Sequence, residues 1–180
     1  INGTVINNEV SYEKDLDKIK IPDYDGMRLD EYIKRGYRYT SSTSRNAPVW
    51  VTRGCPYHCS YCSASLQNGK EIRSHSIEYM IKWIKFLYFD KGITTINIID
   101  DNFTFPPEAA LEFVEKLIER RLDLLWTCPN GLQIETLNRK LLAAMKESGC
   151  YEVAVGIESG DPGILKDMGK NLALETVIEK

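Results

Sequence analysis

Short apolar segments alternate with amphipathic segments along most of this sequence, and that alternation constrains the fold more than any other feature. Segments rich in β-branched and aromatic residues, which are typical of strands, occur at 48–54, 93–100, 122–130 and 151–159. Apolar residues at helical spacing predict helices at 75–92, 107–122, 136–149 and 161–170, with Ser76 and Thr136 as N-caps. Parallel strands joined by helices have this order, so the sequence predicts an α/β fold.

The two faces of the expected strands differ in polarity, which separates two α/β architectures. In segment 93–100, Ile96 and Ile98 alternate with Thr95 and Asn97. Segment 151–159 likewise alternates valine and isoleucine with small or acidic residues. A doubly wound sheet has helices on both faces, so its strands should be apolar throughout. A polar inner face instead suits a partial, open parallel (β/α) barrel of the TIM-like type, which we predict.

Polar or thiol side chains follow each of the four expected strands. Sites in parallel α/β folds form at the carboxyl ends of the strands, so these side chains should converge on one rim. Simpler interpretations exist, because Asp100 and Asp101 could begin a polar turn and Glu158 could pair with Lys166. The residues at the strand ends are Cys55, Asp100, Asp101, Asn102, Cys128, Asn130, Glu158 and Ser159.

Three of the five cysteines lie within the stretch CPYHCSYC at 55–62. An odd, crowded set does not suit a disulfide framework and favours a metal site in a reducing, cytoplasmic environment. A structural zinc site would need a fourth ligand, from Cys128, Cys150 or His58. An iron–sulfur cube is normally held by four thiolates, so three thiolates leave one iron open to a small molecule. A non-catalytic zinc or iron–sulfur module and a catalytic cluster are both interpretations of this stretch.

Net charge and hydropathy indicate which partners to expect for this chain. The formal net charge is −3, which gives no reason to expect a nucleic-acid partner, and no apolar run approaches the ~18 residues of a membrane span. The chain begins at Ile1 and ends within an expected helix, so we expect a piece of a longer protein. Residues 1–46 are interpreted as an irregular connector from an absent N-terminal domain, and residues 47–180 as a core truncated at its C-terminus.

The spacing CxxxCxxC, with an aromatic residue before the last cysteine, resembles the signature of the radical S-adenosylmethionine (SAM) superfamily. Further stretches resemble its cobalamin-associated branch, which typically carries a B12-binding domain before the radical SAM domain. They are APVWVTRGCPYHCSYC, IRSHSIEYM, IIDDNFTF, PNGLQIETL and VGIESGDPGILKDMGK. The likeness runs from about Ala47 to Lys170 and implies about four βα units of a six-unit radical SAM barrel.

The resemblance implies a [4Fe–4S] cluster held by Cys55, Cys59 and Cys62 as the catalytic metal ligands. The amino and carboxylate groups of SAM would bind the open iron, and Tyr61 would lie near the adenine. Reductive cleavage of SAM would then give a 5′-deoxyadenosyl radical that acts on a small-molecule substrate, with flavodoxin or ferredoxin as the reducing partner. Cobalamin-dependent methyl transfer or ring formation is the chemistry that the branch implies.

The resemblance also implies SAM contacts from the ends of two strands. The end of the second strand would meet the methionine ammonium, and the alternation of faces favours Asp101 as the inward carboxylate. The end of the fourth strand would contact the ribose or the sulfonium region, with a glycine leaving space for the ligand. The residues expected to bind SAM are Asp100, Asp101, Asn102, Gly156, Glu158 and Ser159.

Overall fold

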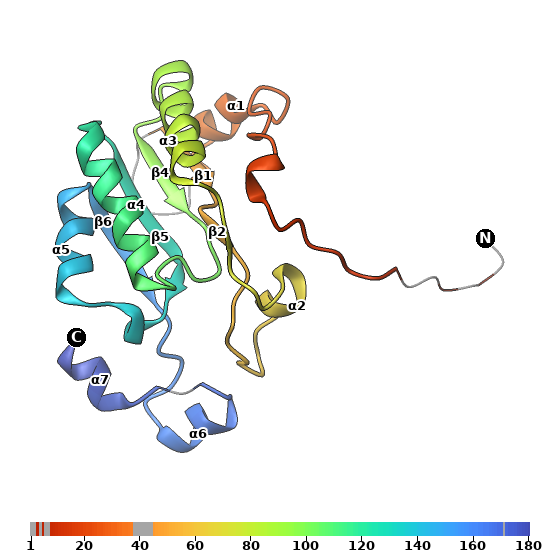
Figure 1. Cartoon of the computed structure of the whole chain (residues 1–180), viewed down its shortest axis with the longest axis vertical. Helices are drawn as coiled ribbons and strands as arrows, with labels where there is room; N and C mark the ends of the chain where they lie inside the picture. Colours follow the sequence, from red (N-terminus) through yellow and green to blue (C-terminus); the bar gives the residue numbers. More distant parts are fainter. Residues whose placement is uncertain (1–2, 4, 6–7, 38–44, 171) are drawn as a thin grey trace.

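A four-stranded parallel sheet forms the centre of the molecule, with strand order β1-β4-β5-β6 (Figure 1). The computed structural model describes residues 3, 5, 8–37, 45–170 and 172–180. The sheet strands are β1 (Asn46–Val49), β4 (Thr95–Ile98), β5 (Leu125–Leu132) and β6 (Cys150–Val155). Parallel pairing of all four strands confirms the predicted α/β architecture.

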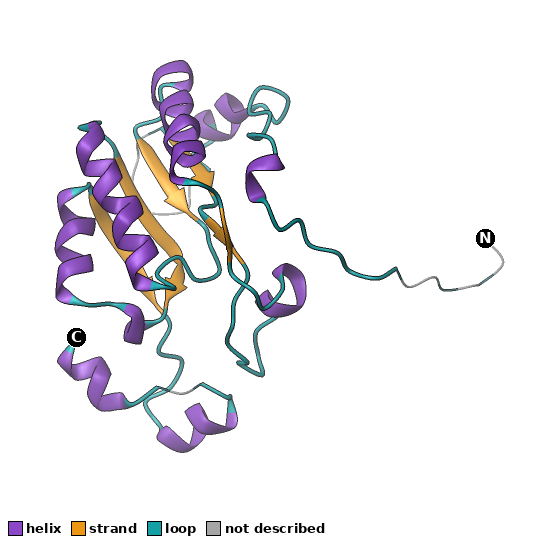
Figure 2. Ribbon diagram, viewed as in Figure 1, coloured by secondary structure: helices purple, strands orange, loops and turns teal. Residues whose placement is uncertain are grey.

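Helices α3, α4 and α5 lie side by side along one face of this sheet (Figure 2). Their bounds are α3 (Ile77–Lys85), which continues into the π-helical turn η2 (Phe86–Asp90), α4 (Pro107–Arg120) and α5 (Arg139–Glu147). The other elements are shorter: η1 (Leu16–Lys18), α1 (Leu29–Lys34), β2 (Thr52–Arg53), α2 (Ala64–Asn68), β3 (Arg73–Ser74), η3 (Ile134–Thr136), α6 (Pro162–Asp167) and α7 (Leu174–Glu179).

The hydrophobic core lies between the sheet and these helices. The strands contribute the side chains of one face, and the helices contribute residues at helical spacing, so the cluster is continuous from β1 to β6. Trp126 is fully buried in this core and donates a hydrogen bond from Nε1 to Ser148 Oγ at 3.0 Å. Core residues on the sheet include Ala47, Val49, Ile96, Ile98, Trp126 and Cys128.

The opposite face of the sheet is polar. Strand register aligns Pro48, Asn97, Thr127 and Glu152 in one row across the four strands. Asn97 donates from Nδ2 to Asn46 Oδ1 at 3.0 Å on the same face. The predicted difference between an apolar and a polar strand face is therefore confirmed, and it suits a barrel interior better than a doubly wound sheet.

The prediction of one continuous strand at 48–54 is wrong. The chain leaves the parallel sheet after Val49, and β2 pairs with β3 in a separate antiparallel ribbon. The physical reason is Asp100, whose carboxylate accepts hydrogen bonds from the backbone N–H groups of Val51 at 2.8 Å and Thr52 at 2.7 Å. The N–H groups of Val51 and Thr52, which could have continued the hydrogen bonding between β1 and β4, are thus bound by the Asp100 side chain.

The predicted start of the helix at 136–149 also needs correction. The segment Ile134–Thr136 is a 3-10 turn, and α5 begins after Asn138, whose Oδ1 accepts a hydrogen bond from Leu141 N at 2.9 Å. Thr136 is buried and its hydroxyl contacts Thr104 Oγ1 and Gln133 O. Ser76 caps α3 as predicted, accepting from Tyr79 N at 3.1 Å.

The N-terminal segment contacts the core through a few side chains. Tyr24 is buried, donates to Pro48 O, and accepts from Trp83 Nε1, each at 3.0 Å. Asp17 Oδ1 lies 3.1 Å from His75 Nδ1. Within the residues that the structure describes, no helix has the length and apolar character needed to cross a membrane.

Candidate functional site

The three clustered cysteines lie on a closed loop, which we call the cysteine loop (residues 54–69). Cys55 N donates to Gly69 O at 3.0 Å, so the two ends of the loop meet beside the β2–β3 ribbon. Gly54 has a φ of 104°, and a Cβ there would lie 2.2 Å from Glu71 O. Only glycine suits this close approach of two backbone segments. The loop contains α2 and presents its thiols at the carboxyl end of β1.

The thiols of the cysteine loop are accessible and unpaired. Cys55 and Cys59 are half-buried, Cys62 is exposed, and none forms a disulfide. Burial raises the pKa of the Cys55 thiol, and the neighbouring charges of Asp101, Cys62 and Cys59 raise it further. These neighbours disfavour an isolated thiolate at Cys55. A cationic metal centre would offset their negative charge and so favour the thiolate form.

The donor chemistry of the loop fits three corners of an iron–sulfur cluster. Three thiols on one short, accessible loop are the ligands that such clusters use. Among the described residues, no group of three His, Cys, Asp or Glu side chains lies close enough to hold a metal ion.

The other two cysteines lie elsewhere. Cys128 is 2% exposed on β5, and burial raises its pKa well above the ordinary value. Cys150 is half-buried at the start of β6, and burial raises its pKa to about 11. The charges that act on Cys128 come from Cys150 and Asp100, not from the cysteine loop. His58 is exposed on the loop itself.

The two adjacent carboxylates after β4 have different environments. Asp100 is 3% exposed, and besides its two backbone bonds it accepts from Thr52 Oγ1 at 2.8 Å. Its oxygens are thus occupied by the β1–β2 bend. Asp101 is half-buried, lies close enough to Cys55 to affect its pKa, and accepts from Asn68 Nδ2 at 2.8 Å. Of the two, Asp101 has the oxygen atoms available to a ligand beside the cysteine loop.

Two asparagines complete this part of the rim. Asn102 is 1% exposed, and among the described residues neither atom of its side-chain amide has a hydrogen-bond partner. A buried amide without partners is costly unless a ligand or water binds it. Asn130 donates from Nδ2 to Ile99 O at 2.8 Å and so connects the bulged part of β5 to the end of β4.

The predicted residues after β6 lie together around Gly156. A Cβ at Gly156 would lie 2.7 Å from Glu158 Oε1 and 3.1 Å from Lys170 Nζ. Glu158 adopts a φ of 70°, and Ser159 Oγ accepts from Asp161 N at 3.0 Å. The partner of Glu158 is Lys170 at 3.3 Å, and not Lys166 as in the simpler interpretation of this residue.

Tyr61 connects the cysteine loop with the end of β6. Burial raises the pKa of its hydroxyl, and the charges of Cys59 and Glu158 raise it further. These two residues come from segments about a hundred positions apart in the sequence. The structure therefore brings the cysteine loop and the ends of β4 and β6 toward one rim. Cys128, predicted to follow a strand at the same rim, instead lies within β5 in the hydrophobic core.

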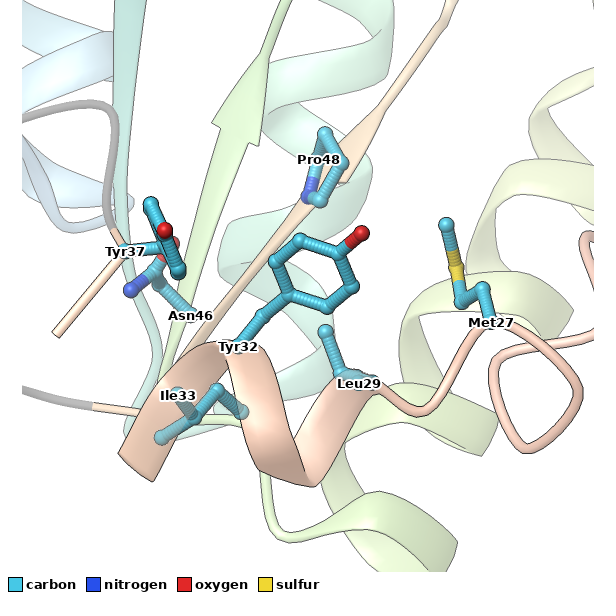
Figure 3. A pocket seen from close by; sticks show the side chains of 7 residues that line it. All are labelled: Met27, Leu29, Tyr32, Ile33, Tyr37, Asn46 and Pro48. Carbon is cyan, nitrogen blue, oxygen red and sulfur yellow. The ribbon is translucent and has the colours of Figure 1, made fainter. Parts of the chain in front are cut away.

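The pocket at the other end of the sheet is a separate feature. It has a volume of about 420 Å³ and lies between α1 and the first residues of β1 (Figure 3). Asn46, which lines this pocket, is the first residue of β1, whereas the cysteine loop follows the carboxyl end of that strand. The lining residues are Met27, Leu29, Tyr32, Ile33, Tyr37, Asn46 and Pro48.

Three residues that contact the predicted site were missed in the sequence. They are Thr52, Asn68 and Lys170, each of which holds a predicted carboxylate. Lys170 follows Gly169 at the end of α6, and its side chain is 4% exposed. A glycine that ends a helix is a readable signal, but it does not predict that the next lysine turns inward.

The chain is similar to known proteins over most of its length. The family model of the Radical SAM superfamily matches residues 49–180. An uncharacterized methyltransferase of Pyrococcus horikoshii is 36% identical over 166 residues, which cover 92% of this chain and 34% of that protein. Cytidylyl-2-hydroxyethylphosphonate methyltransferase of Streptomyces wedmorensis is 30% identical over 164 residues, covering 89% and 30%. The chain thus spans about a third of the length of these curated relatives.

A solved structure shares the fold. It is the radical S-adenosylmethionine methyltransferase TsrM from Kitasatospora setae, with cobalamin and a [4Fe-4S] cluster bound. Its TM-score is 0.69 at 17% sequence identity, and the match covers 83% of this chain and 29% of that one. This likeness confirms the predicted partial, open parallel (β/α) barrel.

Proposed function

Since the chain belongs to the radical SAM superfamily, we propose that it binds a [4Fe–4S] cluster and SAM and forms part of a radical SAM methyltransferase. The observation that carries the proposal is the cysteine loop, with three unpaired thiols on the rim of a partial barrel. When bound, the cluster supplies an electron that cleaves SAM and yields a 5′-deoxyadenosyl radical.

The chain's own residues have distinct parts in this proposal. Cys55, Cys59 and Cys62 would hold the cluster through their thiolates. The negative charge of the Asp101 carboxylate attracts the ammonium group of SAM. This carboxylate lies half-buried beside Cys55, and one of its oxygens, Oδ2, accepts a hydrogen bond from Asn68. Asp100 contributes by fixing the bend between β1 and β2 that directs the chain into the cysteine loop.

The residues after β6 complete the proposed SAM site. Gly156 lets the Glu158 carboxylate and the Lys170 ammonium lie against the backbone, because a Cβ there would lie 2.7 Å from Glu158 Oε1 and 3.1 Å from Lys170 Nζ. Glu158, Ser159 and Tyr61 supply polar groups suited to a ribose and an adenine. Asn102 adds a buried amide whose donor and acceptor are both open.

Methyl transfer with cobalamin as a second cofactor is the finer part of the proposal. It is supported by the two methyltransferases among the relatives and by the stretches that resemble the cobalamin-associated branch. This chain spans about a third of the length of these relatives. A low-potential reductant such as flavodoxin or ferredoxin would supply the electron.

Anaerobic reconstitution with iron and sulfide tests the cluster. We expect about four irons per chain and SAM cleavage on addition of dithionite. Cys59→Ser should lose the iron, whereas Cys150→Ser should keep it, because Cys150 lies at the start of β6. Equal loss in both variants would instead indicate a cluster with a fourth cysteine ligand. Tight binding of one zinc and no iron would contradict the proposal.

A further inference from the structure

The segment after β6, which we call the arm (residues 159–170), contacts the cysteine loop although about a hundred residues separate them. We infer that the arm is a clamp that positions the cysteine loop, with Gly169 and Lys170 as its positioning residues. The contacts are a property of the chain itself, and only their relevance to cluster binding rests on the proposed function.

The first step in the argument is how α6 ends. Asp161 caps its start, accepting from Gly163 N at 2.7 Å and Ile164 N at 3.0 Å. At its end, Lys170 N donates to Leu165 O and Gly169 N donates to Lys166 O, each at 2.9 Å. This pair of bonds is the Schellman motif, which requires a left-handed residue, and Gly169 has a φ of 67°.

The second step is the contact that this turn makes. Ser60 N, between Cys59 and Cys62, donates to Met168 O at 2.8 Å. A Cβ at Gly169 would lie 3.0 Å from His58 O, which is closer than side-chain carbons normally approach backbone oxygen. The absence of a side chain at Gly169 therefore lets the backbone of the cysteine loop lie directly on the end of α6.

The third step is Lys170, which follows the turn. Its side chain is 4% exposed and its Nζ lies 3.3 Å from Glu158 Oε1. A buried ammonium with a carboxylate partner holds that carboxylate in place, because separation would leave a desolvated charge. Glu158 is also close enough to Tyr61 to act on its hydroxyl. Lys170 thus fixes the position of the Glu158 carboxylate, which lies beside Tyr61 of the cysteine loop.

The arm has its own anchor on the barrel. Leu165 is 1% exposed and packs with Ile134 and Leu172 in a small hydrophobic cluster apart from the main core. The clamp therefore does not depend on the cysteine loop for its own position. A rigid support outside the loop restricts the loop backbone while its thiols remain accessible.

Amide exchange in the protein at its full encoded length, without cluster, tests the role of Gly169. Gly169→Ala should accelerate exchange of the Ser60 amide by about tenfold, because alanine resists the left-handed conformation. Gly160→Ala is the matched control, since a Cβ there meets nothing within 4 Å. We expect no change at Ser60 in that control. Equal exchange at Ser60 in the two variants, with α6 still protected, would overturn the clamp.

Thiol alkylation tests the role of Lys170. Lys170→Met removes the charge at similar length and should raise the alkylation rate of the half-buried Cys59 by roughly threefold, because the cysteine loop opens more often when Glu158 is no longer held beside Tyr61. Lys170→Arg should restore the original rate, and the exposed Lys166→Met should not change it. A purely packing role would give the same rate in the methionine and arginine variants, and that result would refute Lys170 as a positioning residue.

The two proposals fail separately. Normal iron binding with no effect of Gly169→Ala or Lys170→Met on the loop would overturn the clamp and leave the proposed function standing. Loosening of the loop in both variants, in a protein that binds no iron, would support the clamp and contradict the proposed function.

Discussion

The arm should open as a cooperative unit of its own, and Leu165→Ala is the change that tests this. Leu165 is the most deeply buried residue of the small cluster with Ile134 and Leu172. Truncation removes about three carbon groups worth about 0.8 kcal/mol each. The remaining cavity raises the total to about 3 kcal/mol. The free energy of opening the arm should fall by that amount.

Hydrogen exchange followed by mass spectrometry measures the effect directly. A loss of about 3 kcal/mol corresponds to about a hundredfold faster exchange of the amides that open with the arm. We expect this acceleration in residues 162–170 and not in β4 or β5.

The matched control is Leu141→Ala, the same truncation at a fully buried position of α5 in the main core. It should lower the free energy of global unfolding by a similar amount and leave the arm no more open than the rest of the chain. If Leu165→Ala accelerated exchange equally in the arm and in the central strands, the arm would not be a separate unit.

Three further predictions concern single side chains. Asn138→Ala should lower the free energy of unfolding by about 1 kcal/mol in urea titrations, because α5 loses the acceptor for Leu141 N; an effect below about 0.3 kcal/mol would argue against this cap. Burial lowers the pKa of His75 against the opposing effect of Asp17, so the folded protein disfavours the protonated ring and its stability should fall as pH drops below about 6.5. His75→Gln should remove that dependence, and a slope unchanged in this variant would assign it to other groups. Asp101→Asn should weaken SAM binding about tenfold in equilibrium dialysis while iron content stays constant, since the amide still accepts from Asn68 but has no charge; unchanged affinity would exclude Asp101 as the partner of the ammonium.

The architecture and the rim could be predicted from the sequence because they depend on local patterns. Alternating apolar segments predict the parallel sheet, and the alternation in 93–100 predicts that Ile96 and Asn97 occupy opposite faces, as they do. Parallel strands also bring their carboxyl ends together wherever they lie in the chain. The approach of Asp101 to Cys55 follows from that rule.

The errors have a common physical origin, which is competition from distant groups. The apolar segment 48–54 has strand propensity throughout, but the Asp100 carboxylate binds two of its N–H groups and ends the strand early. Thr136 is a good N-cap by type, but its hydroxyl is used by Thr104 and Gln133, so Asn138 caps the helix.

The hydrogen bonds of Asp100 make the two adjacent aspartates non-interchangeable. The Asp100 carboxylate connects the end of β4 to the bend after β1 through hydrogen bonds. The Asp101 carboxylate instead bonds to Asn68 of the cysteine loop. Deletion of a single residue within β4 would move Asp101 into the position where Asp100 bonds to the bend after β1, and no carboxylate would then lie beside the cysteine loop. The length of a buried strand is therefore as much a requirement of the site as any thiol in the loop, and insertions or deletions in 95–100 should be tolerated less than substitutions.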